Sequence, residues 1–380
     1  MRKRDYKTLT AKPKRDKLHF RWGRALSYNK TWNFAIGERE SGKTVDSWFA
    51  IWNAFIYENR PSIVFRRRIA DITSAYIDDV ANVLNKFLPD DRQVKLVYIK
   101  GDIKQGVADI KICPIDEEPS YAAIKKMPVF FRIIALSNPM NRIKSMSLPN
   151  IKYFFFDEFI ANLRGGEKYL PADEYFLIQE VYTTYNREAK TPIRIIGAGN
   201  PYSVYTPLFI GLGVDTSKLK PGAFIVGPNY VIDCFQCPPE LKAQILANNP
   251  QYQFDDAYKR YAFGGQAIND QNIRIKKTEP KGFKLKYVFK LGKDFISLHK
   301  GNGSDFKWWC CKHSEDWLDK VGKRRKIVVF NFKDMIDGSY IMSAQDHMSL
   351  YPIKEAMQKR EITYNCIDAQ YMLEDVYSVI

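Results

Sequence analysis

One octapeptide constrains the fold of this chain more than any other feature. It reads Gly37-Glu38-Arg39-Glu40-Ser41-Gly42-Lys43-Thr44. The segment fits the pattern G-x-x-x-x-G-K-[ST] at every fixed position. Apolar residues 32–36 lead into it and are typical of a strand, and residues 45–57 follow it with the spacing of an amphipathic helix. A glycine-rich loop between a strand and a helix predicts an α/β domain with a phosphate-binding loop.

The chemistry of such a loop predicts a nucleotide site. Glycine lets backbone N–H groups turn inward, and the N-terminus of the following helix favours anions. We expect Lys43 to reach the β- and γ-phosphates and the Thr44 hydroxyl to ligate Mg²⁺. The alternative is a glycine turn that happens to carry a lysine. The strand and helix on either side favour the first interpretation, so all eight residues are predicted to bind ATP with Mg²⁺.

An acidic pair supplies the expected second half of this site. The apolar stretch 151–156 contains four consecutive aromatic residues and is followed directly by Asp157 and Glu158. A carboxylate at the end of a buried strand is tolerated when it faces Mg²⁺ and its waters, which we predict for Asp157. Glu158 can accept a proton from the attacking water as a general base. Either carboxylate alone could cap a strand, but the two together predict hydrolysis.

Three further side chains are candidates for a role in hydrolysis. Asn200 follows the strand predicted at 193–196, where its amide can hold the attacking water or contact the γ-phosphate; an ordinary Asn-Pro turn is the alternative. Arg187 ends a helix predicted over 172–187. It can neutralise the nucleotide of a neighbouring subunit, or favour the dipole of its own helix. Lys144 lies on a predicted loop, where residue chemistry alone favours a solvated cation.

Strand-like and helix-like segments alternate through the first 200 residues. Strands are predicted at 32–36, 61–65, 94–99, 109–112, 128–136, 151–156 and 193–196, and helices at 45–57, 70–88 and 172–187. This alternation predicts a parallel sheet covered on both faces. The expected fold class is an α/β P-loop NTPase of RecA-like type.

The pattern of predicted elements along the chain changes after residue 231. Short helices are predicted at 238–248 and 255–263, and short strands at 284–291, 295–299, 306–311 and 326–332. We therefore predict an ATPase domain over 1–233 that begins with a basic arm, 1–24. A helical linker over 234–279 and a small α+β domain over 280–380 follow it.

Positive charge is concentrated in two segments of this chain, whose net charge is +16. Residues 1–30 hold 11 Lys and Arg against two Asp, and residues 276–333 hold 16 against six Asp and Glu. Basic segments on either side of a near-neutral body predict a polyanionic partner, with two solvated faces as the alternative. The run Arg66-Arg67-Arg68 at a predicted strand end can likewise grip phosphates of DNA or simply face water.

Cysteine usage and hydropathy favour a reducing cytoplasm and no membrane span. Six cysteines in 380 residues do not suggest a disulfide framework, and no secretory apolar segment follows the basic N-terminus. The longest uncharged run, 195–214, contains prolines and glycines and makes a poor membrane helix. A zinc site built from Cys234, Cys237, Cys310, Cys311 and His313 is disfavoured, because the second half of this set has neither C-x₂-C nor H-x₃-H spacing.

These motifs, in this order, resemble the viral DNA-packaging ATPases, and most closely the encapsidation protein family of phi29-like podoviruses, which is related to large terminase subunits. The resemblance covers residues 30–205. It rests on the loop 37–44, on Ala135-Leu136-Ser137 followed by Lys144-Ser145, on 153–158, and on 197–200. Residues 234–380 are similar only in layout.

The resemblance implies an ATP-hydrolysing motor that translocates double-stranded DNA into a procapsid. It implies a homo-oligomeric ring, of five subunits, docked on the portal in the host cytoplasm, and it leaves open a structural RNA as a further partner. Arg187 matches a finger that acts on the neighbouring subunit. Lys144 matches a second trans-acting or DNA-proximal cation. The alternatives are another ring-type translocase or helicase, and a DNA-binding scaffold with a non-catalytic nucleotide site.

The C-terminal domain departs from the terminase pattern. Terminases join an RNase H-like nuclease to the motor, and two-metal cleavage needs a central acidic residue. The strands predicted between 284 and 332 carry none, and Asp294 and Asp305 lie in predicted turns. Asp334, Asp337 and Asp368 make no convincing triad. We therefore expect an RNase H-like domain without nuclease activity, which contacts DNA or the portal.

Overall fold

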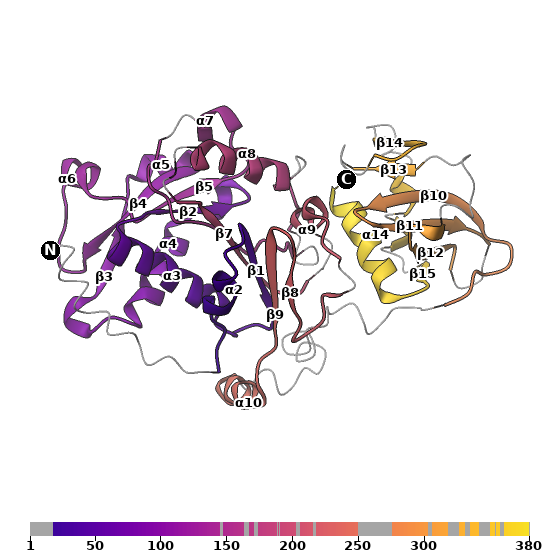
Figure 1. Ribbon diagram of the computed structural model, residues 1–380, viewed down its shortest axis with the longest axis horizontal. Coiled ribbons are helices and arrows are strands. Elements are labelled where there is room, and N and C mark those ends of the chain that lie inside the picture. Colours follow the sequence, from indigo (N-terminus) through magenta and orange to yellow (C-terminus); the bar gives the residue numbers. More distant parts are fainter. Residues whose placement is uncertain are drawn as a thin grey trace. The chain divides into compact units, whose positions relative to one another are not determined.

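A nine-stranded, mostly parallel sheet forms the centre of the amino-terminal part of the chain (Figure 1). Its strand order is β3-β4-β5-β2-β6-β7-β1-β9-β8, and the six strands from β5 to β9 in this order run parallel. The antiparallel pair β3–β4 and the strand β8 lie at the two edges. The strands are β1 Trp32–Gly37, β2 Ser62–Arg66, β3 Val94–Val97, β4 Val107–Pro114, β5 Phe131–Ala135, β6 Tyr153–Asp157, β7 Arg194–Gly199, β8 Phe224–Val226 and β9 Tyr230–Phe235.

The structure is a computed structural model. It describes residues 18–144, 147–162, 167–170, 174–187, 189, 191–202, 206–215, 218–249, 276–302, 306–317, 327–330, 335–341, 350–353, 355–357 and 361–379. The basic arm up to residue 17 and the helix predicted at 255–263 lie outside these ranges. No helix among the described residues is both long and apolar enough to cross a bilayer.

Helices cover both faces of the large sheet, as the alternation of segments predicts. On one face, α3 and α4 pack in one hydrophobic core with residues of the strands, such as Val64 and Phe155, which are both fully buried. On the other face, the ring of Phe154 contacts Tyr182 and Tyr185 of α8. The helices are α2 Gly23–Ser27, α3 Lys43–Glu58, α4 Ser74–Asn85, α5 Lys100–Lys104, α6 Tyr121–Lys126, α7 Met140–Lys144, α8 Glu174–Asn186, α9 Pro207–Leu212 and α10 Pro239–Asn248, with 3₁₀ turns η1 Ile69–Asp71 and η2 Asp90–Arg92.

The structure confirms the strands predicted up to residue 196 and corrects one helix. The helix predicted over 70–88 is a 3₁₀ turn followed by α4, which starts at Ser74. The reason is local, because the Thr73 hydroxyl accepts a hydrogen bond from Tyr76 N at 3.1 Å and so caps a new helix. In the amino-terminal part, the strands β8 and β9 were not predicted. β9 pairs in parallel with β1 and spans residue 233, the predicted end of the first domain.

The carboxyl-terminal part contains a second, smaller sheet with the order β14-β13-β10-β11-β12-β15. β10, β11 and β12 form an antiparallel meander, and β13 runs parallel to β10, β14 to β13 and β15 to β12. The helix α14 packs on this sheet through Met372, Leu373 and Val376. The elements are β10 Lys284–Leu291, β11 Asp294–Lys300, β12 Trp308–His313, β13 Ile327–Val329, β14 Ser339–Ile341, β15 Ile362–Tyr364 and α14 Ile367–Val379.

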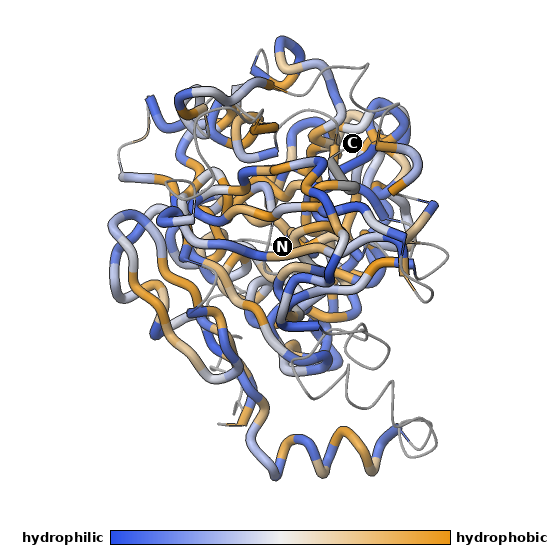
Figure 2. The backbone as a smooth tube through the Cα atoms, turned by 90° about the vertical axis from the view of Figure 1, so that its right-hand side faces the viewer, coloured by the Kyte–Doolittle hydropathy of each residue, from blue (hydrophilic) through white to orange (hydrophobic). Residues whose placement is uncertain are grey.

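The described residues divide into two units. The first takes in 18–159, 176–200 and 220–249, and the second takes in 160–175, 201–219 and 276–379. Figure 2 colours the backbone by hydropathy: hydrophobic stretches (orange) gather toward the middle of the view, and many turns at its margin are hydrophilic (blue). The candidate site described next lies wholly in the first unit.

Candidate nucleotide-binding site

A cavity of about 350 Å³ lies where three neighbouring parallel strands end. The strands β6, β7 and β1 are adjacent in the sheet, so their carboxyl ends share one edge, where parallel sheets bind ligands. The loop after β1, the turn after β6 and the end of β7 therefore meet. The lining residues are Arg39, Glu40, Ser41, Gly42, Lys43, Thr44, Val45, Asp157, Glu158, Ala198, Gly199 and Asn200.

Both fixed glycines of the loop are required by its geometry. Gly42 has a φ of 88° and caps α3 in the left-handed region, which side chains rarely adopt. A Cβ on Gly37 would lie 2.4 Å from the carbonyl oxygen of Phe235 in β9. The first glycine therefore lets the loop pass close to a neighbouring strand, and the second turns the chain into the helix.

Lys43 is held inside the loop in this structure. Its Nζ donates to the carbonyl oxygens of Gly37 and Glu38, at 2.8 and 2.7 Å, and to the Ser41 hydroxyl at 3.0 Å. Burial lowers the pKa of Lys43 to about 8, against the opposing influence of nearby anionic groups such as Asp157. The loop therefore presents one buried ammonium group at the edge of the cavity.

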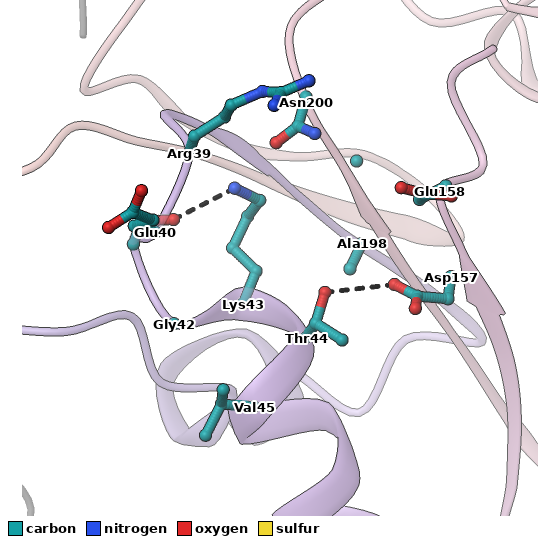
Figure 3. A pocket seen from close by; sticks show the side chains of 12 residues that line it. Arg39, Glu40, Gly42, Lys43, Thr44, Val45, Asp157, Glu158, Ala198 and Asn200 are labelled. Carbon is teal, nitrogen blue, oxygen red and sulfur yellow. Dashed lines mark hydrogen bonds between the residues drawn. The ribbon is translucent and has the colours of Figure 1, made fainter. Parts of the chain in front are cut away.

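Asp157 and Thr44 lie close enough to share a cation. The Thr44 hydroxyl donates to Asp157 Oδ1 at 3.1 Å across the cavity (Figure 3). Burial, and then the neighbouring Glu158, raise the pKa of Asp157 to about 6, while Arg66, Thr44 and Lys43 oppose the shift. A hydroxyl and a carboxylate are the oxygen ligands that Mg²⁺ prefers beside nucleotide phosphates. The donor set therefore fits the predicted metal.

Glu158 stands on an unusual backbone turn after β6. Its φ is 57°, in the left-handed region, and its side chain is exposed. Arg67, which is buried, donates through Nη1 to the carbonyl oxygen of Glu158 at 2.7 Å and through Nη2 to that of Phe159. Arg66 Nη2 lies 3.7 Å from Glu158 Oε2, and its guanidinium lies 4.7 Å from the centre of the Tyr76 ring.

The roles of these two arginines are not evident from the sequence alone. The run Arg66-Arg67-Arg68 is predicted either to grip DNA or to face water, and neither alternative describes Arg67, which holds the turn that carries Glu158. Arg66 contacts the Glu158 carboxylate itself. The sequence does show that β2 ends in arginines. Their contact with the Glu158 turn, however, follows only from the position of β2 beside β6 in the sheet.

The other predicted residues fall in two groups. Asn200 lines the cavity at the end of β7, on the same side as Arg39 in Figure 3. Arg187 and Lys144 do not line it. Arg187 is exposed just after α8, and Lys144, predicted on a loop, is instead the last residue of α7, with its Nζ 3.2 Å from Glu180 Oε2. Their action on a neighbouring subunit stays a prediction.

Not every residue of the phosphate loop lines the cavity. Seven consecutive residues from Arg39 onward face the cavity, whereas Gly37 and Glu38 do not line it, although both were predicted to bind nucleotide. Their carbonyl oxygens instead accept hydrogen bonds from Lys43. In the described ranges, no group of three or more His, Cys, Asp and Glu side chains is arranged to hold a metal by itself. The cysteines are free thiols.

A glycine-rich loop at the N-terminus of α3, facing an Asp-Glu pair across a parallel sheet, defines a P-loop-like α/β domain. Solved structures with a similar fold are phage motor proteins. The Phi-28 gp11 DNA packaging motor is 15% identical, with 96% of this chain and 98% of that chain covered and a TM-score of 0.56. The bacteriophage Phi-29 viral genome packaging motor assembly is 18% identical, with 96% and 100% covered and a TM-score of 0.54.

A third match is the N-terminal domain of the DNA packaging ATPase from bacteriophage phi29, 25% identical, covering 59% of this chain and 98% of that domain, with a TM-score of 0.44. No protein-family model and no curated protein matches the sequence. From the first two matches, the chain has the fold of phage DNA-packaging motor proteins over nearly its whole length.

Proposed function

We propose that this protein is an ATP-hydrolysing motor that translocates double-stranded viral DNA into a procapsid. The observation that carries the proposal is the 3.1 Å contact between Thr44 of the phosphate loop and Asp157 of the acidic pair, because it brings both halves of a hydrolytic site to one cavity. The fold shared with phage DNA-packaging motors supports DNA as the polymer that the motor moves.

The residues around the cavity have distinct roles in this proposal. Lys43 exchanges its loop acceptors for phosphate oxygens when ATP binds. Thr44 and Asp157 would hold Mg²⁺, and the ion would neutralise developing phosphate charge. Glu158 takes the proton of the attacking water, and Arg66 restrains its carboxylate. Asn200, at the end of β7, contacts the water or the γ-phosphate and links hydrolysis to movement of that strand.

Residues outside the cavity act between subunits. Arg187 is exposed and does not line the cavity of its own chain, which suits a finger that completes a neighbour's site. Lys144 is a second such cation or a DNA contact. In either role it leaves its ion pair with Glu180 and contacts the neighbouring subunit or the DNA instead. We propose a homo-oligomeric ring of five subunits on the portal of the procapsid in the host cytoplasm, and we leave open a structural RNA as a further partner.

The second unit supplies a surface for the DNA backbone. Lys284 and Lys300 lie directly opposite each other on β10 and β11, and Lys276, Lys286 and Lys307 are exposed nearby in the sheet or its flanking segment. Like charges opposite each other destabilise a sheet, so a bound polyanion compensates for their repulsion. Phosphate contacts of this kind carry no sequence preference, which a packaging motor requires.

We propose that residues 280–380, which follow a linker over 234–279 and belong to this unit, form an RNase H-like domain without nuclease activity. Its three-stranded meander extended by the parallel strands β13 and β14 supports that fold. Asp294 was predicted in a turn but begins β11, and its Oδ2 lies 3.2 Å from Lys312 Nζ. Asp368 Oδ2 lies at the same distance from that ammonium group. Two carboxylates paired with an internal lysine argue against a metal-dependent nuclease.

The decisive experiment is steady-state ATP hydrolysis with and without duplex DNA. We expect DNA to stimulate turnover in the wild type, Glu158→Gln to abolish it, and Arg187→Ala subunits mixed into wild type to reduce it by more than dilution. Stimulation that survives Glu158→Gln refutes the assigned base. DNA binding without turnover identifies a scaffold, and strand displacement identifies a helicase. Cleavage of plasmid DNA in Mn²⁺ contradicts the inactive nuclease domain.

A further inference from the structure

Glu38, the second residue of the phosphate loop, points away from the cavity and is held by the segment that follows β9. Its side chain is 2% exposed and does not line the cavity. Its Oε2 accepts a hydrogen bond from Cys237 N at 2.7 Å. Its Oε1 lies 2.8 Å from the Nζ of Lys242, on the first turn of α10. The loop thus forms an ion pair with a helix about 200 residues further along the chain.

The charge of Glu38 matters because of where it lies. Its own carbonyl oxygen accepts from Lys43 at 2.7 Å, so the carboxylate belongs to the loop that receives the phosphates. A buried carboxylate is costly unless a cation neutralises it, and an uncompensated one repels a polyphosphate. Lys242 supplies that cation from outside the cavity.

The helix α10 is positioned firmly enough to keep Lys242 in place. Leu241 and Ile245 are buried with Cys237 in a small apolar cluster against Phe235 of β9. At the far end of the helix, Asn249 Nδ2 donates to Glu40 Oε2 at 3.1 Å, a second link to the phosphate loop. Lys242 therefore faces Glu38 because of packing and does not depend on the ion pair alone.

We propose that Lys242 sets the affinity of the loop for ATP by neutralising Glu38. The inference rests on the proposed function only in that ATP binds at this loop. Lys242 touches no reacting atom, so it is a positioning residue that acts through Glu38. Since α10 carries it, displacement of α10 weakens nucleotide binding, which gives the chain beyond β9 a means of releasing nucleotide.

The test is a double-mutant cycle on ATP affinity, measured by equilibrium titration with a fluorescent ATP analogue on the full chain. We expect Lys242→Met to raise the Kd about fifteenfold to thirtyfold, the interaction between two unit charges about 8–10 Å apart in an effective dielectric constant of about 20. Glu38→Gln should lower the Kd, because it leaves the positive charge of Lys242 uncompensated near the phosphates. The double variant should bind within about threefold of wild type, because it removes both charges of the pair.

Lys152→Met is the matched control. Lys152 Nζ lies 2.7 Å from Glu58 Oε2, and its side chain is 22% exposed against 26% for Lys242. Glu58 ends α3, whose 16 residues separate it from the loop by about 24 Å at 1.5 Å per residue. The control should therefore leave the Kd unchanged.

Two outcomes overturn the inference alone: a Lys242→Met variant that binds ATP as wild type does, or a double variant as weak as Lys242→Met. The second shows that Lys242 acts through packing and not through charge. If Lys242→Met does not fold, Lys242→Arg should keep wild-type affinity and the neutral double variant should bind ATP; failure of either refutes the charge argument. A wild-type protein that binds no ATP overturns the proposed function and this inference together.

Discussion

Glu158 offers a substitution pair in which stability and activity are expected to separate. Its φ of 57° places a non-glycine residue in the left-handed region, at a strain of about 1–2 kcal/mol. Glycine relieves that strain but loses about 0.5–1 kcal/mol more backbone entropy on folding than alanine does. We therefore expect Glu158→Gly to be more stable than Glu158→Ala by about 0.5–1 kcal/mol, the reverse of the usual order.

The comparison isolates the backbone. Both variants lose the contact between Arg66 Nη2 and the Glu158 carboxylate, so that loss cancels. Asp79, exposed in the middle of α4, is the control, because there alanine should be more stable than glycine by about 1 kcal/mol. Equilibrium urea unfolding followed by tryptophan fluorescence measures both differences.

Activity should fall in both Glu158 variants. Removing a general base costs about 10²–10⁴ in rate, so ATP turnover should drop by that factor even in the more stable glycine variant. An alanine variant that is as stable as the glycine variant would refute the left-handed turn. A glycine variant that still hydrolyses ATP at the wild-type rate would refute the role of the carboxylate.

Three further predictions concern residues that support the site or the second unit. Arg67→Met should lower the free energy of unfolding by about 3 kcal/mol, since it removes charged hydrogen bonds to two carbonyl oxygens, and should also lower kcat; an unchanged urea midpoint would contradict this. Lys284→Glu should stabilise the second unit by a few tenths of a kcal/mol, because it faces Lys300, while its duplex-DNA affinity becomes weaker and less dependent on salt; tighter binding would exclude this surface. Burial and then His299 lower the pKa of His313 to about 4, below the 6.5 of an unfolded histidine, so the unfolded chain binds the proton more readily between these values. The contribution of His313 to stability should therefore be complete above about pH 6.5. On acidification the free energy of unfolding should fall by less than about 1.4 kcal/mol per pH unit, because the ring is only partly buried. Urea unfolding at pH 5 and pH 7.5 measures this dependence, and His313→Asn should reduce it.

Local patterns were sufficient for the centre of the site. The spacing of glycines, lysine and threonine in residues 37–44, and the acidic pair after four aromatic residues, are properties of short segments. Their meeting in space followed from a general rule, that carboxyl ends of parallel strands share one edge. Lys144 shows where local patterns fail. It was predicted on a loop but ends a helix of five residues, which is too short to show a helical period in the sequence.

Strand order decided the surroundings of the site. Arg67 reaches the Glu158 turn because β2 is inserted between β5 and β6, although β2 precedes both in the chain. The pairing of β9 with β1 likewise brings Cys237 and Lys242 to the phosphate loop across about 200 residues. Such contacts arise from the packing of distant segments and leave no periodic trace in either one.

The linear order of residues was thus enough to predict a phosphate loop, a facing acidic pair and an alternating α/β framework, because each depends on neighbours a few positions away. Only the folded arrangement revealed which charges surround that loop: Arg66 and Arg67 beside the acidic turn, and Lys242 behind Glu38. Burial makes these charges costly unless they are paired, and pairing is a property of three-dimensional proximity.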